Sequence, residues 1–278
     1  MVEARLARLR GICLIATLGG GFHATAFAAA DTEHERELEI GGGVTWAPDY
    51  SGSNGSSSQP RLWVNGAWHT ADFGTFAIDS GSLTIDPELR WDFVESPRGN
   101  LGVLLGYRPG RNDNRSSLWS LGSGNADLRG LAQVDSAIDI GVQGYIAPFG
   151  VPLFAQVRSA LNGTQGTLVN LGVFAVLPLG LDGDLTILPT VTWANARQMR
   201  AFYGVSPVEA NSSPFVAYAP GAGWENYALE TVADWPLTSH WHLIASLAYQ
   251  RLIAGAAASP LVQNKNLLSG LIGFAWHL

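Results

Sequence analysis

Apolar and polar residues alternate along segment after segment of this chain, and this period of two limits its fold more than any other feature. Residues 83–93 show the pattern: one face carries Leu83, Ile85, Pro87, Leu89, Trp91 and Phe93, and the other carries Thr84, Asp86, Glu88, Arg90 and Asp92. After residue 30, no segment reaches the roughly 18 consecutive apolar residues that a membrane-spanning helix needs. The pattern predicts an all-β chain.

Segment spacing predicts how these strands are connected. We expect about twelve strands, near residues 37–47, 59–68, 72–80, 83–94, 100–109, 134–147, 150–161, 166–179, 183–195, 224–236, 239–253 and 267–278. Ten strands are the alternative, because 72–80 is the weakest segment. The three longest connections, 110–133, 196–223 and 254–266, all fall on one side, and the tight turns near 147–150 and 236–238 fall on the other. An even number of strands with long loops on one side is typical of a bacterial outer-membrane barrel.

Composition helps to choose between a soluble β-sandwich and a membrane barrel. Only 14% of residues are charged, against roughly 25% in an average soluble domain. A sandwich needs a charged, wet outer face, whereas a membrane barrel turns its apolar face to lipid and its polar face to the lumen. Aromatic residues stand near the strand ends, as in membrane-interface girdles; they are Trp46, Trp193, Tyr227, Trp235, Trp241 and Trp276. We therefore predict a transmembrane, antiparallel, up-and-down β-barrel.

The first thirty residues have the pattern of an export signal. Arg5, Arg8 and Arg10 precede a mostly apolar stretch that ends in small residues, with cleavage expected after Ala28 or Ala30. A transmembrane anchor is the alternative, but the apolar run is short and contains three consecutive glycines. The single cysteine, Cys13, would leave with the signal. We expect residues 1–30 to be a cleaved signal peptide and 31–278 to be the barrel domain, in the outer membrane of a Gram-negative bacterium.

Charge excludes two functional classes. The net charge is −7 and Lys265 is the only lysine, so the chain lacks the basic surface that nucleic acids require. A phosphate-binding P-loop needs Gly-Lys-Ser/Thr, whereas Lys265 lies between two asparagines. We expect no nucleic-acid partner and no cofactor.

Several short motifs, in a fixed order, resemble one family of outer-membrane proteins. The clearest runs from Leu188-Pro-Thr-Val-Thr-Trp-Ala194, through Met199, to Phe202, Tyr203, Gly204, Val205 and Ser206 in an expected external loop. Further matches are Gly41–Val44, Pro48–Ser53, Tyr107–Arg111, Gly221–Gly223, Leu237–Trp241 and Ser259–Val262. These motifs occur in the same order as in the MipA/OmpV family, the MltA-interacting protein family, and span nearly the whole chain after residue 30. The sequence therefore resembles that family. The chain departs from the usual barrel pattern in ending on Leu278 rather than on an aromatic residue.

The resemblance implies a non-enzymatic scaffold that connects a lytic transglycosylase with a penicillin-binding protein in peptidoglycan (murein) synthesis. The expected periplasmic turns are short, so partners would bind those turns, the barrel rim or the charged residues 31–37. The alternative is a small cation-preferring channel or uptake barrel. The external loop carrying Phe202–Ser206 would either plug the barrel mouth or present an outer surface.

Alternation also predicts which charged side chains face the lumen. They are Asp86, Glu88, Arg90, Asp92, Arg108, Asp135, Asp139, Arg158, Glu230 and Asp234. Two interpretations are open: a cation-preferring pore lining, because acids outnumber arginines, or a packed, ion-paired interior. We favour the packed interior.

The histidines are the side chains in this sequence best suited to metal binding or general-base chemistry. His240 and His242 flank Trp241 at an expected strand start and could bind a metal with a third ligand, but such residues are more often solvated polar groups at the periplasmic interface. His69 with Ser80 or Ser82, and His277 with Ser269, have no spacing that predicts a nucleophile and its base. We expect neither a catalytic nor a metal site.

Overall fold

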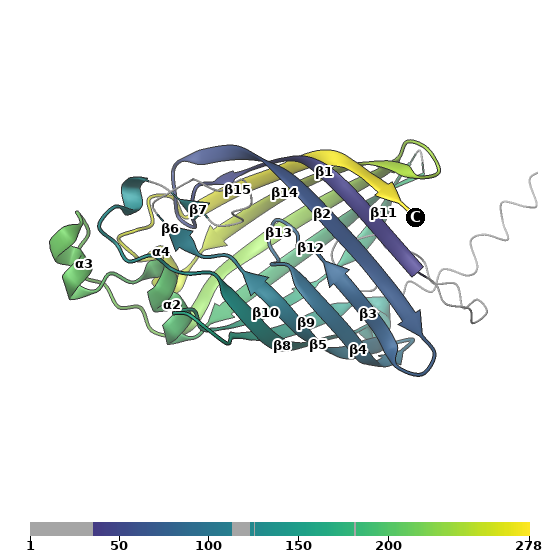
Figure 1. Ribbon diagram of the computed structural model, residues 1–278, viewed down its shortest axis with the longest axis horizontal. Helices are drawn as coiled ribbons and strands as arrows, with labels where there is room; N and C mark the ends of the chain where they lie inside the picture. Colours follow the sequence, from purple (N-terminus) through teal and green to yellow (C-terminus); the bar gives the residue numbers. More distant parts are fainter. Residues whose placement is uncertain (1–35, 113–122, 125, 181) are drawn as a thin grey trace, which may run out of the picture.

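The strands of the computed structural model, which describes residues 36–112, 123–124, 126–180 and 182–278, form a closed barrel (Figure 1). The predicted signal peptide and most of the charged segment 31–37 lie outside these residues. The wall strands are β1 (Arg36–Pro48), β2 (Ser56–Thr70), β3 (Gly74–Asp79), β4 (Glu88–Ser96), β5 (Gly99–Arg108), β8 (Ala137–Ile146), β9 (Leu153–Ala160), β10 (Thr167–Val173), β11 (Ala175–Gly180), β12 (Gly183–Ala194), β13 (Gly223–Pro236), β14 (Trp241–Leu252) and β15 (Asn266–His277).

All of these wall strands pair antiparallel with their neighbours. β1 pairs with both β2 and β15, which joins the first strand to the last. β10 and β11 lie end to end on either side of Phe174, and both pair with β12, which completes the ring. Counting these two as one, the thirteen described wall strands give a barrel of twelve, as predicted. The predicted single strand 166–179 is interrupted at Phe174, whose side chain is buried against Tyr145.

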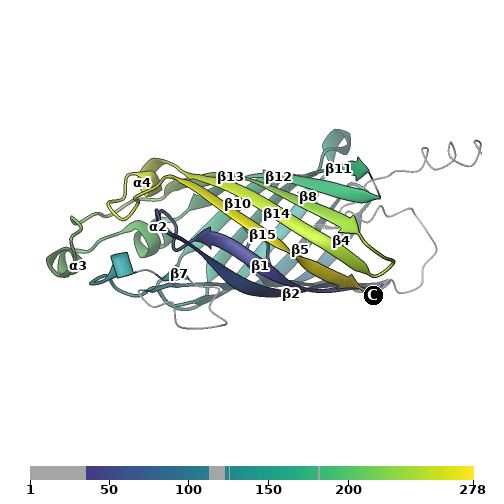
Figure 2. The same cartoon turned by 90° about the horizontal axis from the view of Figure 1, so that it is seen from above.

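The two ends of the barrel differ (Figures 1 and 2). One end, here called the loop end, carries α2 (Ala196–Tyr203), α3 (Pro207–Ser212), α4 (Ala254–Ala257), η2 (Ala126–Leu128) and the short pair β6 (Arg111–Asn112) and β7 (Ser123–Gly124). The other, the turn end, carries the C-terminus, the tight connections and η3 (Pro148–Gly150). The three longest connections all lie at the loop end, which confirms the predicted alternation of long and short connections.

No helix in the described part of the chain is long and apolar enough to span a membrane.

The barrel wall is apolar outside and largely polar or small inside. In β5, Leu101, Val103, Leu105 and Tyr107 are exposed, while the residues between them and Arg108 face inward and are mostly buried. A soluble sandwich would bury its apolar face. Here the apolar side chains are on the outside, as expected of a barrel wall that faces lipid. The structure thus confirms a transmembrane barrel rather than a sandwich.

The predicted strand 83–94 is wrong over its first five residues. β3 ends at Asp79 and β4 begins at Glu88, so residues 80–87, called here the plug segment, leave the wall. The chain turns at Gly81, whose φ is +74° and where a Cβ would lie 2.5 Å from the carbonyl oxygen of Ile85. The Asp79 side chain accepts a hydrogen bond of 2.6 Å from the Gly81 N–H. An Asx turn of this kind favours departure from a strand.

Candidate functional site

The plug segment crosses the lumen. It follows β3, and four strands (β2, β1, β15 and β14) separate β3 from β13 in the sheet. On β13, the Glu230 carboxylate accepts hydrogen bonds from Ser82 Oγ (2.8 Å), Leu83 N (3.0 Å), Thr84 N (3.1 Å) and Thr84 Oγ1 (2.6 Å). One carboxylate therefore holds three consecutive residues of the plug segment against the far wall.

The opposite side of the plug segment packs on apolar side chains. Ile85 contacts the buried cluster of Tyr145, Phe154, Phe174 and Leu188, which comes from the β8–β12 side of the barrel and from the break between β10 and β11. The residues between Ser82 and Ile85 thus contact two different parts of the wall. Ser82 and Thr84 bind Glu230, Ile85 packs on the interior cluster, and Leu83 lines a small interior cavity with Arg61 and Trp63. The alternation is therefore present, but neither apolar residue faces lipid.

Arg61 on β2 fixes the start of the plug segment. Its guanidinium donates to the carbonyl oxygens of Gly81 (2.6 Å), Ser82 (3.1 Å) and Ser80 (3.2 Å). The Ser80 hydroxyl also hydrogen-bonds the backbone of Val64 on the same strand. These bonds satisfy carbonyl groups that have left the sheet and would otherwise be costly to bury.

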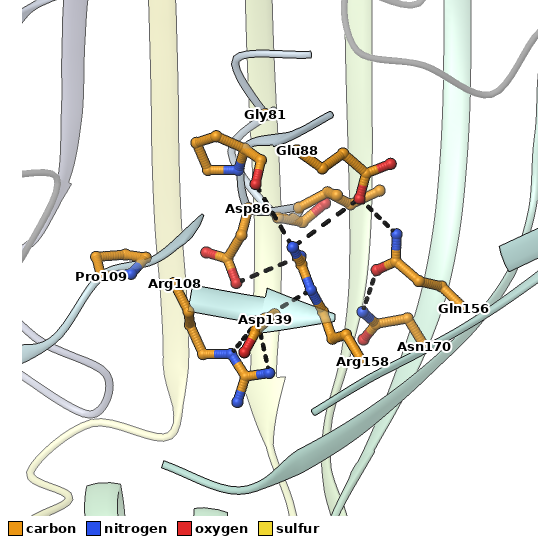
Figure 3. Close-up of polar contacts among 12 residues, drawn as sticks. Gly81, Asp86, Glu88, Arg108, Pro109, Asp139, Gln156, Arg158 and Asn170 are labelled. Atoms are coloured by element: carbon orange, nitrogen blue, oxygen red, sulfur yellow. Dashed lines mark hydrogen bonds and ion pairs between the residues drawn. The ribbon is translucent and has the colours of Figure 1, made fainter. Parts of the chain in front are cut away.

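An ion-pair network extends from the end of the plug segment across β4, β8 and β9 (Figure 3). Arg158 on β9 lies 3.2 Å from Asp139, 3.7 Å from Asp86 and 3.9 Å from Glu88, measured between nitrogen and oxygen atoms. Its side chain is 1% exposed. Because a buried guanidinium is stable only with such partners, Arg158 binds the plug segment to the wall.

Arg108 on β5 extends this network toward the loop end. Its Nη2 atom lies 2.8 Å from Asp139 Oδ2, and its Nη1 atom donates to Gln198 Oε1 (2.9 Å) on α2 and to the carbonyl oxygen of Gly166 (3.0 Å). Asp139 is therefore shared between two arginines, and one side chain connects the barrel interior with the helix over its mouth.

Uncharged polar residues continue the network along the wall. Gln156 donates to Glu88 (2.8 Å), Asn170 donates to Gln156 (3.2 Å), and Thr192 donates to Asn170 (2.9 Å). Gln156 and Asn170 were not predicted, because only charged residues were assigned to the lumen face, and Arg61 was not predicted either. The two amides occupy the inward-facing positions of their strands, so including Asn and Gln in the polar face would have found them.

Helix α2 covers the loop end of the lumen. Asn195 caps it by accepting a hydrogen bond from Gln198 N, and Met199 and Tyr203 are fully buried beneath it. Tyr203 donates to the Glu225 carboxylate (2.9 Å). Burial, and next the negative charge of Glu225, raise the pKa of Tyr203 well above its usual value of 10, so its hydroxyl remains a donor.

A cavity of about 210 Å³ with a mixed polar and apolar lining lies between the plug segment and α2. Its lining includes Thr84 and Asp86 from the plug segment, Arg108 from the wall, and Gln198 and Tyr203 from α2. The plug segment and α2 therefore line opposite sides of this cavity.

The structure brings together five of the ten predicted lumen residues: Asp86, Glu88, Arg108, Asp139 and Arg158. Arg90 and Asp92 form a separate buried pair at 2.9 Å, and Glu230 binds the plug segment instead. Asp234 lies toward the turn end, 2.7 Å from His242. Asp135 differs from the prediction: β8 begins two residues later, and its side chain is exposed outside the wall.

The predicted external loop divides between two environments. Tyr203, Gly204 and Val205 are buried, whereas Phe202 is half-buried and Ser206 is exposed as the cap of α3. The segment therefore both covers the mouth and continues into an outer surface.

In the structure, His69 does not pair with Ser80 or with Ser82. His69 contacts Thr75 (3.1 Å) and Glu95 (3.2 Å), while Ser80 bonds to β2 and Ser82 to Glu230.

Comparison with known proteins assigns the family. A family model described as "MltA-interacting protein MipA" matches residues 40–278. The chain belongs to the MipA family. This match spans nearly the whole barrel and confirms the resemblance seen in the sequence motifs. No curated protein matches the chain.

Solved structures similar to this MipA-family barrel include OprB of Pseudomonas putida, with a TM-score of 0.41, 9% identity, and coverage of 88% of this chain and 94% of that one. The NanC porin has a TM-score of 0.41, 11% identity, and coverage of 88% and 100%. The translocator domain of the autotransporter NalP from Neisseria meningitidis has a TM-score of 0.39, 11% identity, and coverage of 99% and 95%.

Proposed function

We propose that this MipA-family barrel is a closed, non-enzymatic scaffold of the outer membrane that binds a lytic transglycosylase of peptidoglycan metabolism. The observation that carries the proposal is the plug segment, which joins Arg61 and Glu230 across the lumen. A barrel whose interior is bridged in this way is built to present its ends and rim rather than to conduct solutes.

The family supports the choice of partner. Its description names an MltA-interacting protein, and the partner class inferred from the sequence resemblance is a lytic transglycosylase, with a penicillin-binding protein as a second component. Such enzymes act in the periplasm. With the termini and short turns on the periplasmic side, the usual orientation of bacterial barrels, the partner would bind the turn end.

Exposed apolar side chains mark a surface for this contact. Phe73 lies in the turn between β2 and β3, Leu237 in the turn between β13 and β14, and Leu278 at the C-terminus, and all three are exposed. These side chains lie at turns and at the chain end rather than within the strands, and aromatic residues such as Phe73 are enriched at protein interfaces.

The alternative function, a small cation-preferring channel, requires a path through the lumen. The cavity lined by Asp86 and Glu225 is its best support. That cavity is bounded by the plug segment and α2, so conduction would require the bonds to Glu230, Arg61 or Gln198 to break. The geometry therefore favours the scaffold.

Site-specific photocrosslinking in intact envelopes tests the scaffold. A photoreactive residue at Phe73 or Leu237 is expected to capture a lytic transglycosylase. The same residue at Val216, which is equally exposed but lies at the loop end, is the matched control and is expected to capture none.

Planar-bilayer recording on the same purified protein distinguishes the alternative. The scaffold predicts no defined conductance steps. Regular steps together with no crosslinked transglycosylase would overturn it and make the carboxylates of the lumen the functional site.

A further inference from the structure

A second polar cluster lies toward the turn end of the barrel, apart from the plug segment. It contains Glu39 on β1, Asp234 on β13, His242 on β14 and His277 on β15. These four strands are consecutive in the sheet, in the order β13-β14-β15-β1. The cluster therefore spans the seam at which the first and last strands of the barrel meet.

The geometry of the cluster is compact. His242 Nδ1 lies 2.7 Å from Asp234 Oδ1, and His277 Nε2 lies 3.0 Å from Glu39 Oε2. The two imidazole rings stack in parallel, with centroids 3.9 Å apart and planes at 6°. One possible ligand atom from each of Asp234, His242 and His277 lies within 4.8 Å of the others.

We propose that Asp234, His242 and His277 bind a divalent transition-metal ion of the zinc type. Two imidazole nitrogens with one carboxylate oxygen form a common protein ligand set for Zn²⁺, with Zn–N distances of roughly 2.0–2.1 Å. Ligand atoms around a tetrahedral ion lie about 3.3 Å apart at such bond lengths. Because imidazole lone pairs lie in the ring plane, the two stacked rings must rotate out of their parallel arrangement to direct their nitrogens at one ion. His277 would ligate through Nδ1, since Glu39 contacts its Nε2, and a water molecule would be the fourth ligand.

Glu39 serves as a positioning residue for this site. It contacts His277, and its other oxygen accepts hydrogen bonds from Trp63 Nε1 (2.7 Å) and Asn65 Nδ2 (2.8 Å). A carboxylate that orients a metal-binding imidazole in this way fixes its tautomer and ring direction. The Glu39 side chain is only 6% exposed, so its hydrogen bonds are protected from water.

The cluster is accessible to an ion. The side chains of His242 and His277 are 17% and 24% exposed, and that of Asp234 is 11% exposed. The site is thus sheltered but not sealed. An ion bound there would link β13, β14 and β15 directly, and β1 through Glu39, so it would stabilise the seam of the barrel.

The inference is independent of the proposed scaffold function, and direct metal binding tests it. The folded barrel, purified without a polyhistidine tag and stripped with a chelator, is titrated with Co²⁺ by visible absorption and with Zn²⁺ by calorimetry. We expect one ion per chain, an absorption spectrum typical of four-coordinate cobalt, and a higher melting temperature with Zn²⁺, since a ligand of the folded state stabilises it.

Variants identify the ligands. His242→Gln and His277→Gln are each expected to weaken Zn²⁺ binding at least tenfold. Glu39→Gln should weaken it roughly 10-fold or more, because Glu39 orients the His277 ring without touching the ion. His69→Gln is the matched control, because His69 also pairs with a carboxylate, Glu95, at 3.2 Å; it should bind as the parent does. His240→Gln is a second control, since that exposed ring lies outside the metal-binding group.

Two results would overturn the site. One is a wild-type barrel that shows no stoichiometric Co²⁺ spectrum, a measurement that does not depend on whether any variant folds. The other is equal loss of Zn²⁺ affinity in the ligand variants and in His69→Gln, which would indicate nonspecific binding.

Discussion

At the scale of single residues, buried charges inside this barrel are organised around Arg158. Its guanidinium is within ion-pair distance of three carboxylates from β8, β4 and the plug segment. Removing one partner of a buried ion pair is costly because the remaining charges lose their compensation. Arg158 is therefore the residue whose loss should affect stability most directly.

We expect Arg158→Met to lower the free energy of unfolding by about 3–5 kcal/mol. The change keeps a long apolar chain but leaves Asp86 and Glu88 without their shared cation. Guanidinium unfolding in lipid vesicles, followed by tryptophan fluorescence, measures the difference. Arg98→Met, on an exposed turn, is the control and should change stability little.

A second substitution tests the cause of that loss. If repulsion among the abandoned carboxylates is responsible, Glu88→Gln added to Arg158→Met should recover part of the stability, as a coupled pair does in a double-mutant cycle. Strict additivity of the two changes would contradict the ion-pair explanation.

At the scale of elements, the plug segment is held by charged side chains at its start, in its middle and, through the ion pair of Arg158 with Asp86, near its end. Arg61 binds the carbonyl oxygens at its start, and Glu230 binds its middle residues from the far wall. Charged groups make stronger hydrogen bonds than neutral ones. The segment should therefore stay in place when only one of Arg61 and Glu230 is removed.

We predict that the double variant Arg61→Ala and Glu230→Ala conducts ions in planar bilayers, whereas the parent does not. Releasing the plug segment frees the centre of the lumen and exposes the acidic lining, so cations should pass more readily than anions. Asp72→Ala with Arg98→Ala removes one acid and one base from exposed turns and serves as the matched control. An unchanged current in the double variant would show that another element, such as α2, is the barrier.

At the scale of the whole molecule, the outer surface determines where the protein can reside. β8 presents Ile138, Ile140, Val142 and Ile146 outward, all exposed. Across the wall, its inward Asp139 is fully buried. A barrel with this polarity buries its apolar surface only when lipid surrounds it.

We expect Val142→Arg, near the middle of β8, to destabilise the barrel in vesicles by about 2–4 kcal/mol. Ile146→Arg, at the end of the same strand, is the matched control and should cost about 0–1 kcal/mol, because its side chain reaches the interface. Unfolding of both variants in the same lipid gives the comparison. Equal costs would mean that β8 does not cross the hydrocarbon layer along its length.

The local sequence pattern was sufficient to predict the strands of the barrel, their two faces and the two ends of the barrel. The period of two identified the inward and outward faces of β5 and β8, and the lengths of the connections placed the loops and turns at opposite ends. Both are properties of neighbouring residues, since a strand exposes alternate side chains whatever it pairs with. The ordered motifs likewise pointed to the MipA family, which the match over residues 40–278 established.

Contacts across the lumen were decided only by the tertiary structure. Residues 82–87 alternate as a strand would, yet Thr84 binds Glu230, 146 positions away, and Ile85 packs on an interior cluster. The metal-binding group has the same origin, because barrel closure brings Glu39 on the first strand beside His277 on the last. Contacts between residues so far apart in the sequence depend on the number of strands and their register around the whole barrel. No local period encodes which distant side chains will face each other.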